Sequence, residues 1–162
     1  MRLSVTLLLA AGLALPGLAQ AHEYVLEDLV LVHPFATPAP PGVPHAAAYV
    51  DIRVEGETPA VLIGARTPAS ESVGLYETRR EEGEPERRRL ERIEVPAGIT
   101  QLMRPEGGYH LMLEGLVAPL GLGERFPMTL EFAERGEVEV EVWVQSAERG
   151  SRAADGHHHD LR

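Results

Sequence analysis

The chain has no cysteine and no lysine among its 162 residues, and its formal net charge is −10. Without a thiol the protein has no disulfide bonds, no cysteine nucleophile and no blue-copper electron-transfer site, which requires a thiolate ligand. The acidic balance argues against nucleic acid and anionic membrane surfaces as main partners. The fold must therefore be held by burial alone, and thiol chemistry is excluded.

Motifs of catalysis are also missing. The sequence contains no glycine-rich phosphate loop, no nucleophile elbow and no paired catalytic motif with a recognised spacing. Ser70 and Ser72 lie beside Glu71, but the sequence places no histidine near them. We therefore expect a protein that is not an enzyme.

The first 21 residues have the pattern of a secretory signal peptide. Arg2 gives a positive start, residues 3–18 are almost wholly apolar, and Ala19-Gln20-Ala21 is a small-x-small cleavage pattern. Pro16 interrupts the apolar run, which is too short for a comfortable membrane span. We expect cleavage after Ala21, export of the mature chain, and no membrane span within it.

The remainder is typical of an all-β domain, because short apolar stretches alternate with turn signals and no window of helical length carries a clear apolar stripe. Residues 79–89 (RREEGEPERRR) are expected to form a solvated hairpin tip or loop, and residues 146–162 a disordered tail. A β-sandwich or small barrel is predicted. The expected strands are 25–32, 46–54, 60–65, 72–78, 90–95, 100–103, 109–113, 126–132 and 137–144, the last with clean period-two alternation.

The segment Tyr109 to Leu113 carries the clearest chemistry. On a strand, Tyr109, Leu111 and Leu113 would share the core face, and His110 and Met112 would share the other. An imidazole beside a thioether is a soft N/S pair suited to Cu(I). The alternative is ordinary packing, because methionine often fills gaps in cores.

Several short stretches occur in a characteristic order. They are His22-Glu23-Tyr24, His33-Pro34-Phe35-Ala36, Ala47-Ala48-Tyr49, Pro68 to Val73 (PASESV), Ile93 to Gly98 (IEVPAG) and Gly107 to Gly115 (GGYHLMLEG). With them the chain resembles the PCuAC family of periplasmic copper chaperones over residues 22–145. The resemblance implies a cupredoxin-like Greek-key β-sandwich, a periplasmic location, and transfer of copper toward cytochrome oxidase assembly.

The family's Cu(I) site is written H-M-x10-M-x21-H-x-M, and only its second half is kept. His110 and Met112 fall on the last His and Met, whereas Tyr76, Glu77 and Arg88 replace the first His and the two other Met residues. A guanidinium repels a metal cation, and a phenol is a poor Cu(I) ligand. If this alignment is right, Tyr76 and Arg88 should lie close to His110 and Met112.

Further histidines offer ligands for Cu(II). Cleavage after Ala21 would give His22 a free α-amine beside its imidazole, a chelating pair, although chain ends are usually frayed. His157, His158 and His159 form a run flanked by carboxylates that can bind Cu(II), or else a polar end that binds metals only incidentally. His33 is better explained by a buried hydrogen bond.

Two functions follow from these observations. The first is a copper-binding chaperone with an altered primary site, whose partners are the copper ion and a copper-accepting oxidase subunit or another periplasmic chaperone. The second is a metal-independent interaction or assembly module on the same fold, which the replacement of ligands by Tyr76 and Arg88 favours.

Overall fold

The computed structural model describes residues 23–159, with side chains up to His157, so the predicted signal peptide and His22 lie outside the described residues. Eleven strands and one helix form this part of the chain. They are β1 (Glu23–Leu26), β2 (Leu29–Ala36), β3 (His45–Val54), β4 (Ala60–Arg66), β5 (Ser70–Glu81), β6 (Glu84–Leu90), β7 (Ile93–Val95), β8 (Thr100–Gln101), β9 (Gly108–Leu116), β10 (Arg125–Phe132), β11 (Gly136–Val144) and α1 (Ala147–His159).

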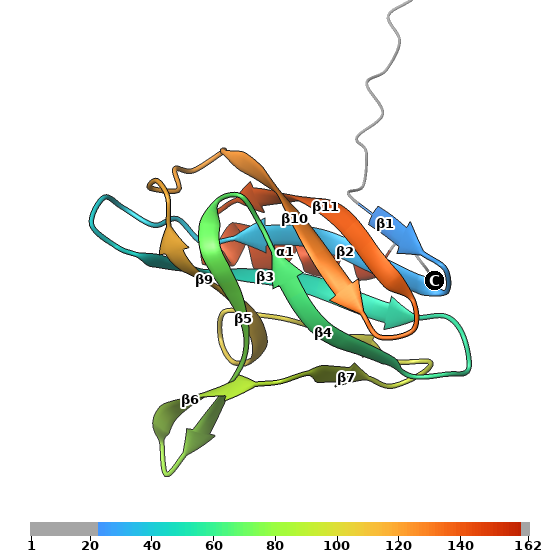
Figure 1. Ribbon diagram of the computed structural model, residues 1–162. Helices are drawn as coiled ribbons and strands as arrows, with labels where there is room; N and C mark the ends of the chain where they lie inside the picture. The colour runs from blue at the N-terminus through green and yellow to red at the C-terminus, as the bar shows by residue number, and fades with distance from the viewer. Residues whose placement is uncertain (1–22, 160–162) are drawn as a thin grey trace, which may run out of the picture.

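Hydrogen bonds connect the strands in the order β6-β5-β9-β3-β2-β11-β10-β4-β7, with β1 added beside β2 and β8 beside β3. Neighbours are antiparallel except β11 and β2, which run parallel where Trp143 pairs with Phe35. The path curls over, so that β4 and β10 lie across from β3 and β9, and β4 contacts β5 without pairing with it (Figure 1). The fold is the cupredoxin-like β-sandwich that the sequence predicted.

Period-two alternation builds the core between the two layers. On β3, every second residue from Ala46 to Val54 is buried, and on β10 the same holds from Phe126 to Phe132. Burying one large aliphatic side chain contributes about 1.5–3 kcal/mol, and many are fully buried here. They include Leu29, Leu31, Ile52, Leu62, Ile93, Leu111, Leu113 and Leu130.

β2 is buried along its whole length because its outer face is also covered. Helix α1 packs over it, and Gly150 meets the ring of Phe35 so closely that an added Cβ would overlap that ring. Arg104 links the helix to the sheet, with Nη2 2.9 Å from Oδ2 of buried Asp51 and 2.7 Å from Oδ1 of Asp155.

The predicted disordered tail is therefore wrong for residues 147–159. The inward face of α1 is made of small residues, including Gly150 and Ala154, rather than of large apolar ones. Such a face packs closely against the ring of Phe35 but produces no amphipathic signal in the sequence. Helix α1 is too short and too polar to cross a membrane, and no other helix occurs in residues 23–159.

The charged segment forms an extended hairpin. β5 and β6 pair out to Glu81 and Glu84, and the two residues between them, Glu82 and Gly83, have φ values of 50° and 92°. Two consecutive positive φ angles match the type I′ turn that suits the right-handed twist of a hairpin. The hairpin leaves the sandwich as an arm (Figure 1), and its strands run longer than the sequence suggested because a solvated, charged ribbon needs no core.

Candidate functional site

The predicted pair lies on one side of β9. Leu111 and Leu113 point into the core, whereas His110 and Met112 project from the opposite face, each with 6% of its surface exposed. Met112 is not part of the main core cluster. The thioether and the imidazole are therefore near neighbours outside the sandwich core, as the strand pattern predicted.

Small residues flank Met112 on both neighbouring strands. It pairs with Ala47 of β3 and with Gly74 of β5. The ring of Tyr76 leans over Gly74, since a Cβ added there would lie 2.6 Å from Tyr76 Cε2. Glycine at position 74 thus gives the phenol ring room to lie along the strand instead of standing away from it.

Tyr76 covers the pair. It is opposite His110 in the register, and the two rings stack with centroids 5.8 Å apart. Its hydroxyl donates a 2.6 Å hydrogen bond to Oε1 of Glu114, which lies four residues beyond His110 on the same face of β9. Because Met112 lies between His110 and Glu114 on this face and pairs with Gly74, over which the ring leans, we infer that the phenol ring lies over Met112.

The protonation states suit this arrangement. Burial lowers the pKa of His110, and the nearby Arg87 charge lowers it further, whereas a hydrogen bond with the backbone of Gly108 opposes the shift. The imidazole is therefore neutral at pH 7, with a lone pair able to bind a metal.

The hydrogen bond between Tyr76 and Glu114 shifts the pKa values of the two groups in opposite directions. The bond to Glu114 raises the pKa of Tyr76, and the same bond is the main cause of the lowered pKa of Glu114. Ser72 also donates to Glu114 at 3.1 Å, and Arg89 lies 3.3 Å from it. A protonated phenol thus faces an ionised carboxylate throughout the neutral range.

The prediction that Arg88 lies beside the pair is wrong. Arg88 pairs with Glu77 in the hairpin register, and its guanidinium lies 3.3 Å from that carboxylate. Position 77 is one residue from Tyr76, so Glu77 and Arg88 lie on the opposite face of the hairpin. Tyr76 does lie beside His110 as predicted, but both positions aligned with Met residues point away from the pair.

Arg87 and Arg89 take the place next to the pair instead. Arg89 is opposite Tyr76 in the register, with its guanidinium 5.7 Å from the centre of the phenol ring. Arg87 is two residues earlier on the same face and acts electrostatically on His110 and Tyr49. Sequence reasoning missed both arginines. Placing the turn at Glu82-Gly83 and pairing the strands outward from it would have put Arg87 and Arg89 on the same face as Tyr76.

A row of rings connects this site with the C-terminal helix. Each ring centroid lies 5.0–6.4 Å from the next. In order they are Tyr76, His110, Tyr49, Phe35, His33 and His157. The site and the histidine run therefore share one outer face of the sheet.

His33 and His157 form the far end of this row, with ring centroids 5.5 Å apart. His33 sits in a bulge of β2 with φ 45°, and its Nε2 lies 2.9 Å from Oε1 of Gln145. The expectation of a buried hydrogen bond for His33 is confirmed. Within the described residues, no three His, Cys, Asp or Glu side chains cluster as a metal site.

A model of the putative lipoprotein LpqE-like family matches residues 29–144, which include β2 to β11. The chain belongs to the LpqE-like family. A putative lipoprotein from Leifsonia xyli subsp. xyli (strain CTCB07) is 36% identical over 100 residues, which are 61% of this chain and 60% of that protein.

Solved structures confirm the resemblance to PCuAC domains. The copper-bound PCuAC domain from PmoF2 is 26% identical, with a TM-score of 0.65 over 77% of this chain and 98% of that one. The solution structure of CuI-DR1885 from Deinococcus radiodurans is 30% identical, with a TM-score of 0.56 over 70% of this chain and 76% of that one. This LpqE-like protein contains no cysteine, so none of its 162 residues could carry a cysteine-linked lipid.

Proposed function

We propose that this LpqE-like protein is a copper-binding protein of chaperone type that holds Cu(I) between His110 and Met112. The observation that carries the proposal is the projection of both side chains from one face of β9, outside the core. The likeness to the copper-bound PmoF2 domain and to CuI-DR1885 supports it.

The chemistry of the pair favours Cu(I) over harder ions. A thioether is a soft ligand that selects Cu(I), and a neutral imidazole accepts it as well. Burial keeps the pKa of His110 low, so that a proton does not compete for the nitrogen at pH 7. Two donors hold the ion less firmly than a complete set, which suits a protein that passes its cargo to a partner with more ligands.

In the same proposal the chain ends supply nitrogen ligands for Cu(II). His22, at the start of the exported chain, and the run of His157, His158 and His159 would capture Cu(II). Of these, His157 stands beside His33 on the outer face that also carries His110. The tail would thus collect copper on the face where the Cu(I) pair lies.

The proposed setting is the periplasm, reached by means of the signal peptide of residues 1–21. The recipient would be a copper-accepting oxidase subunit or another periplasmic chaperone, and the protein itself would catalyse no reaction. The export pattern and the PCuAC-type fold support this setting.

A second function is favoured by the covering phenol. The Tyr76–Glu114 hydrogen bond would close the space over Met112, and both remaining Met positions of the family pattern carry charged residues that pair with each other. On that evidence the domain would be an assembly module that has given up metal binding.

Separate Cu(I) and Cu(II) titrations of the mature, untagged protein distinguish the two functions. The test variant is His110→Ala with Met112→Leu, and a second variant changes His157, His158 and His159 to Gln, which leaves α1 in place. The chaperone function predicts micromolar or tighter Cu(I) binding that the first variant loses and the second keeps, and Cu(II) binding that the second variant weakens. If neither ion bound, the chaperone function would be refuted and the assembly module would be the function left to test.

A further inference from the structure

The β5–β6 hairpin separates its charges by face. Residues of β5 and their partners on β6 alternate between the two sides of the ribbon, so the register assigns every charge to one side. The first side, which we call the basic face, carries Tyr76, Thr78, Arg80, Pro85, Arg87 and Arg89. The second, the mixed face, carries Glu77, Arg79, Glu81, Glu84, Glu86 and Arg88.

The mixed face carries four glutamates against two arginines and is only partly self-paired, whereas the basic face carries no acidic residue of the hairpin. Glu77 bonds both Arg79, at 2.9 Å, and Arg88, at 3.3 Å. On the basic face Arg89 pairs with Glu114, but within residues 23–159 Arg80 and Arg87 form no salt bridge. The hairpin therefore contributes three arginines and no carboxylate of its own to this face, and within the described residues only Arg89 of the three is paired, in a protein whose net charge is −10.

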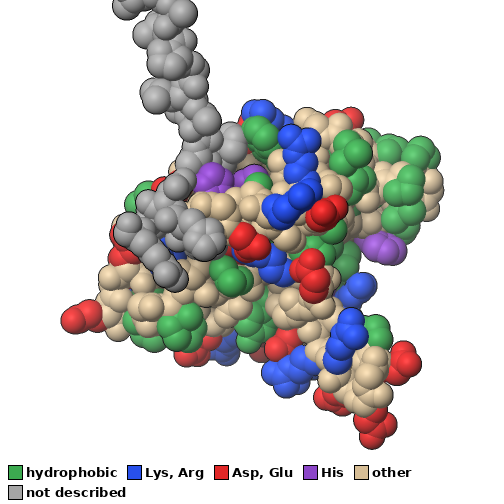
Figure 2. All heavy atoms as spheres, turned by 180° about the vertical axis from the view of Figure 1, so that it is seen from behind, with side chains coloured by type: hydrophobic (Ala, Val, Ile, Leu, Met, Phe, Trp, Pro, Cys, Tyr) green, Lys and Arg blue, Asp and Glu red, His purple; other side chains and the backbone are tan. Residues whose placement is uncertain are grey.

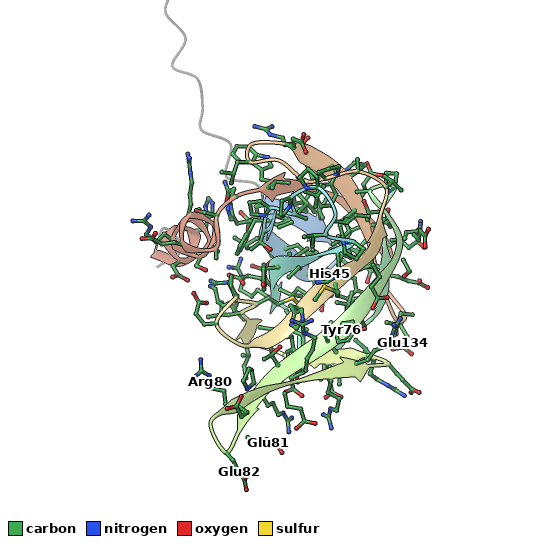
Figure 3. All side chains as sticks on the ribbon, turned by 90° about the vertical axis from the view of Figure 1, so that its left-hand side faces the viewer. His45, Tyr76, Arg80, Glu81, Glu82 and Glu134 are labelled. Atoms are coloured by element: carbon green, nitrogen blue, oxygen red, sulfur yellow. The ribbon has the colours of Figure 1, made fainter. Side chains whose placement is uncertain are left out.

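This basic face leads directly to the candidate copper site. Arg89 borders Tyr76, Tyr76 stacks on His110, and Arg87 lies two residues before Arg89 on the same face. Figure 3 shows the arm leaving the body near Tyr76, with Arg80 and Glu82 toward its tip. Seen from behind, the arm stands clear of the body and carries blue and red side chains (Figure 2).

We propose that the basic face of the hairpin docks the acidic surface of a protein partner that exchanges copper with His110 and Met112. This rests on the proposed function. Exposed charges of one sign raise the rate of encounter with a complementary surface and fix its orientation. A partner held against Arg80, Arg87 and Arg89 would be placed beside Tyr76, the residue that covers Met112.

Docking uses the face of the ribbon rather than its edge. β6 is the last strand of the sheet path, and its side chains are exposed up to Arg89. That edge carries Pro85 and a dense run of charges. Both features prevent a further strand from pairing with it. The overall charge of −10 disfavours an anionic membrane as the occupant.

The test uses ¹⁵N-labelled, copper-free protein titrated with a decaglutamate peptide at low salt, followed by amide chemical shifts. Arg80→Gln with Arg87→Gln removes two charges from the basic face, and the matched control, Arg79→Gln with Arg88→Gln, removes two from the mixed face. Arg89 is left intact because it contacts Tyr76. We expect shifts along the basic face, a loss of affinity of at least about fivefold in the first variant, and less than about twofold in the control.

Equal weakening by both variants would overturn the proposal, because net charge alone would then explain binding. Shifts elsewhere, or none, would also overturn it. Cosedimentation with phosphatidylserine vesicles is a second measurement. Binding to vesicles without binding to the peptide would assign the basic face to a membrane instead. Because the peptide titration contains no copper, a negative result would refute the docking proposal without affecting the copper titration. Conversely, if the peptide bound but Cu(I) did not, only the proposed copper function would be refuted.

Discussion

Replacing Tyr76 by Phe should raise the affinity for Cu(I). The substitution keeps the ring that stacks on His110 but removes the hydroxyl that donates to Glu114 at 2.6 Å. In the wild-type protein this bond holds the ring across Met112, so an approaching ion must first displace it. The free energy of that bond therefore opposes metal binding.

The magnitude follows from the strength of the bond. A hydrogen bond to a charged acceptor contributes about 1.5–3 kcal/mol, and the lower end applies because Tyr76 is only half-buried. About 1.4 kcal/mol corresponds to an open fraction of roughly one tenth, and the apparent dissociation constant rises by the inverse of that fraction. Tyr76→Phe should thus bind Cu(I) about tenfold more tightly.

Competition with a chromophoric Cu(I) chelator under anaerobic conditions measures the effect. The background should carry Gln at positions 157–159, so that tail histidines do not contribute. Ser72→Ala is the control, because it removes another hydrogen bond to Glu114, of 3.1 Å, without freeing the ring; its affinity should stay within about twofold. An unchanged or weaker affinity of Tyr76→Phe would refute the covering role of the phenol.

Three further predictions follow from the same geometry. Tyr76→His should supply a second imidazole and raise Cu(I) affinity at least about tenfold, whereas Arg88→Met should add nothing because position 88 faces away; the chelator competition measures both. Gly150→Ala should destabilise the fold by about 1–3 kcal/mol, because its Cβ would overlap a phenyl ring of β2, whereas Gly156→Ala, which meets nothing within 4 Å, should not; urea denaturation measures the difference. Burial and a neighbouring charge lower the pKa of His110 below its ordinary value of 6.5, so the unfolded protein takes up a proton at this residue before the folded protein does. The contribution of His110 to stability should therefore be full above pH 6.5 and fall as the pH drops toward the folded-state pKa. Denaturation at about pH 7.5 and about pH 5.5 should show a smaller loss of stability for His110→Gln than for the wild-type protein.

The sequence predicted the sandwich well because burial acts on alternate residues of a strand. The segment VEVEVWV, from Val138 to Val144, places a valine at every second position and lies within β11. The same rule placed His110 and Met112 together on the outer face of β9. Period-two reasoning succeeded wherever one face of a strand meets the core.

Prediction failed where contacts do not depend on large apolar side chains. Helix α1 is held by Gly150 against Phe35 and by the Arg104–Asp155 ion pair. Neither contact produces an apolar stripe, so the segment was expected to be disordered. Close approach of a backbone to an aromatic ring depends on tertiary structure, which composition does not contain.

Spacing in a family pattern also does not determine the direction of a side chain. Arg88 occupies the position of the middle Met residue, but the register of the hairpin turns it toward Glu77 and away from His110. The tight turn at Glu82-Gly83 is consistent with that register. The covering role of Tyr76 was likewise hidden, because it requires Gly74 and Glu114 at the same place.

Copper K-edge X-ray absorption of the Cu(I)-loaded protein, with Gln at positions 157–159, tests the central claim most directly. If His110 and Met112 hold the ion, the spectrum must contain both nitrogen and sulfur scatterers, and Met112→Leu must remove the sulfur. A Cu(I) spectrum with no sulfur scatterer, or one that Met112→Leu leaves unchanged, would contradict the account.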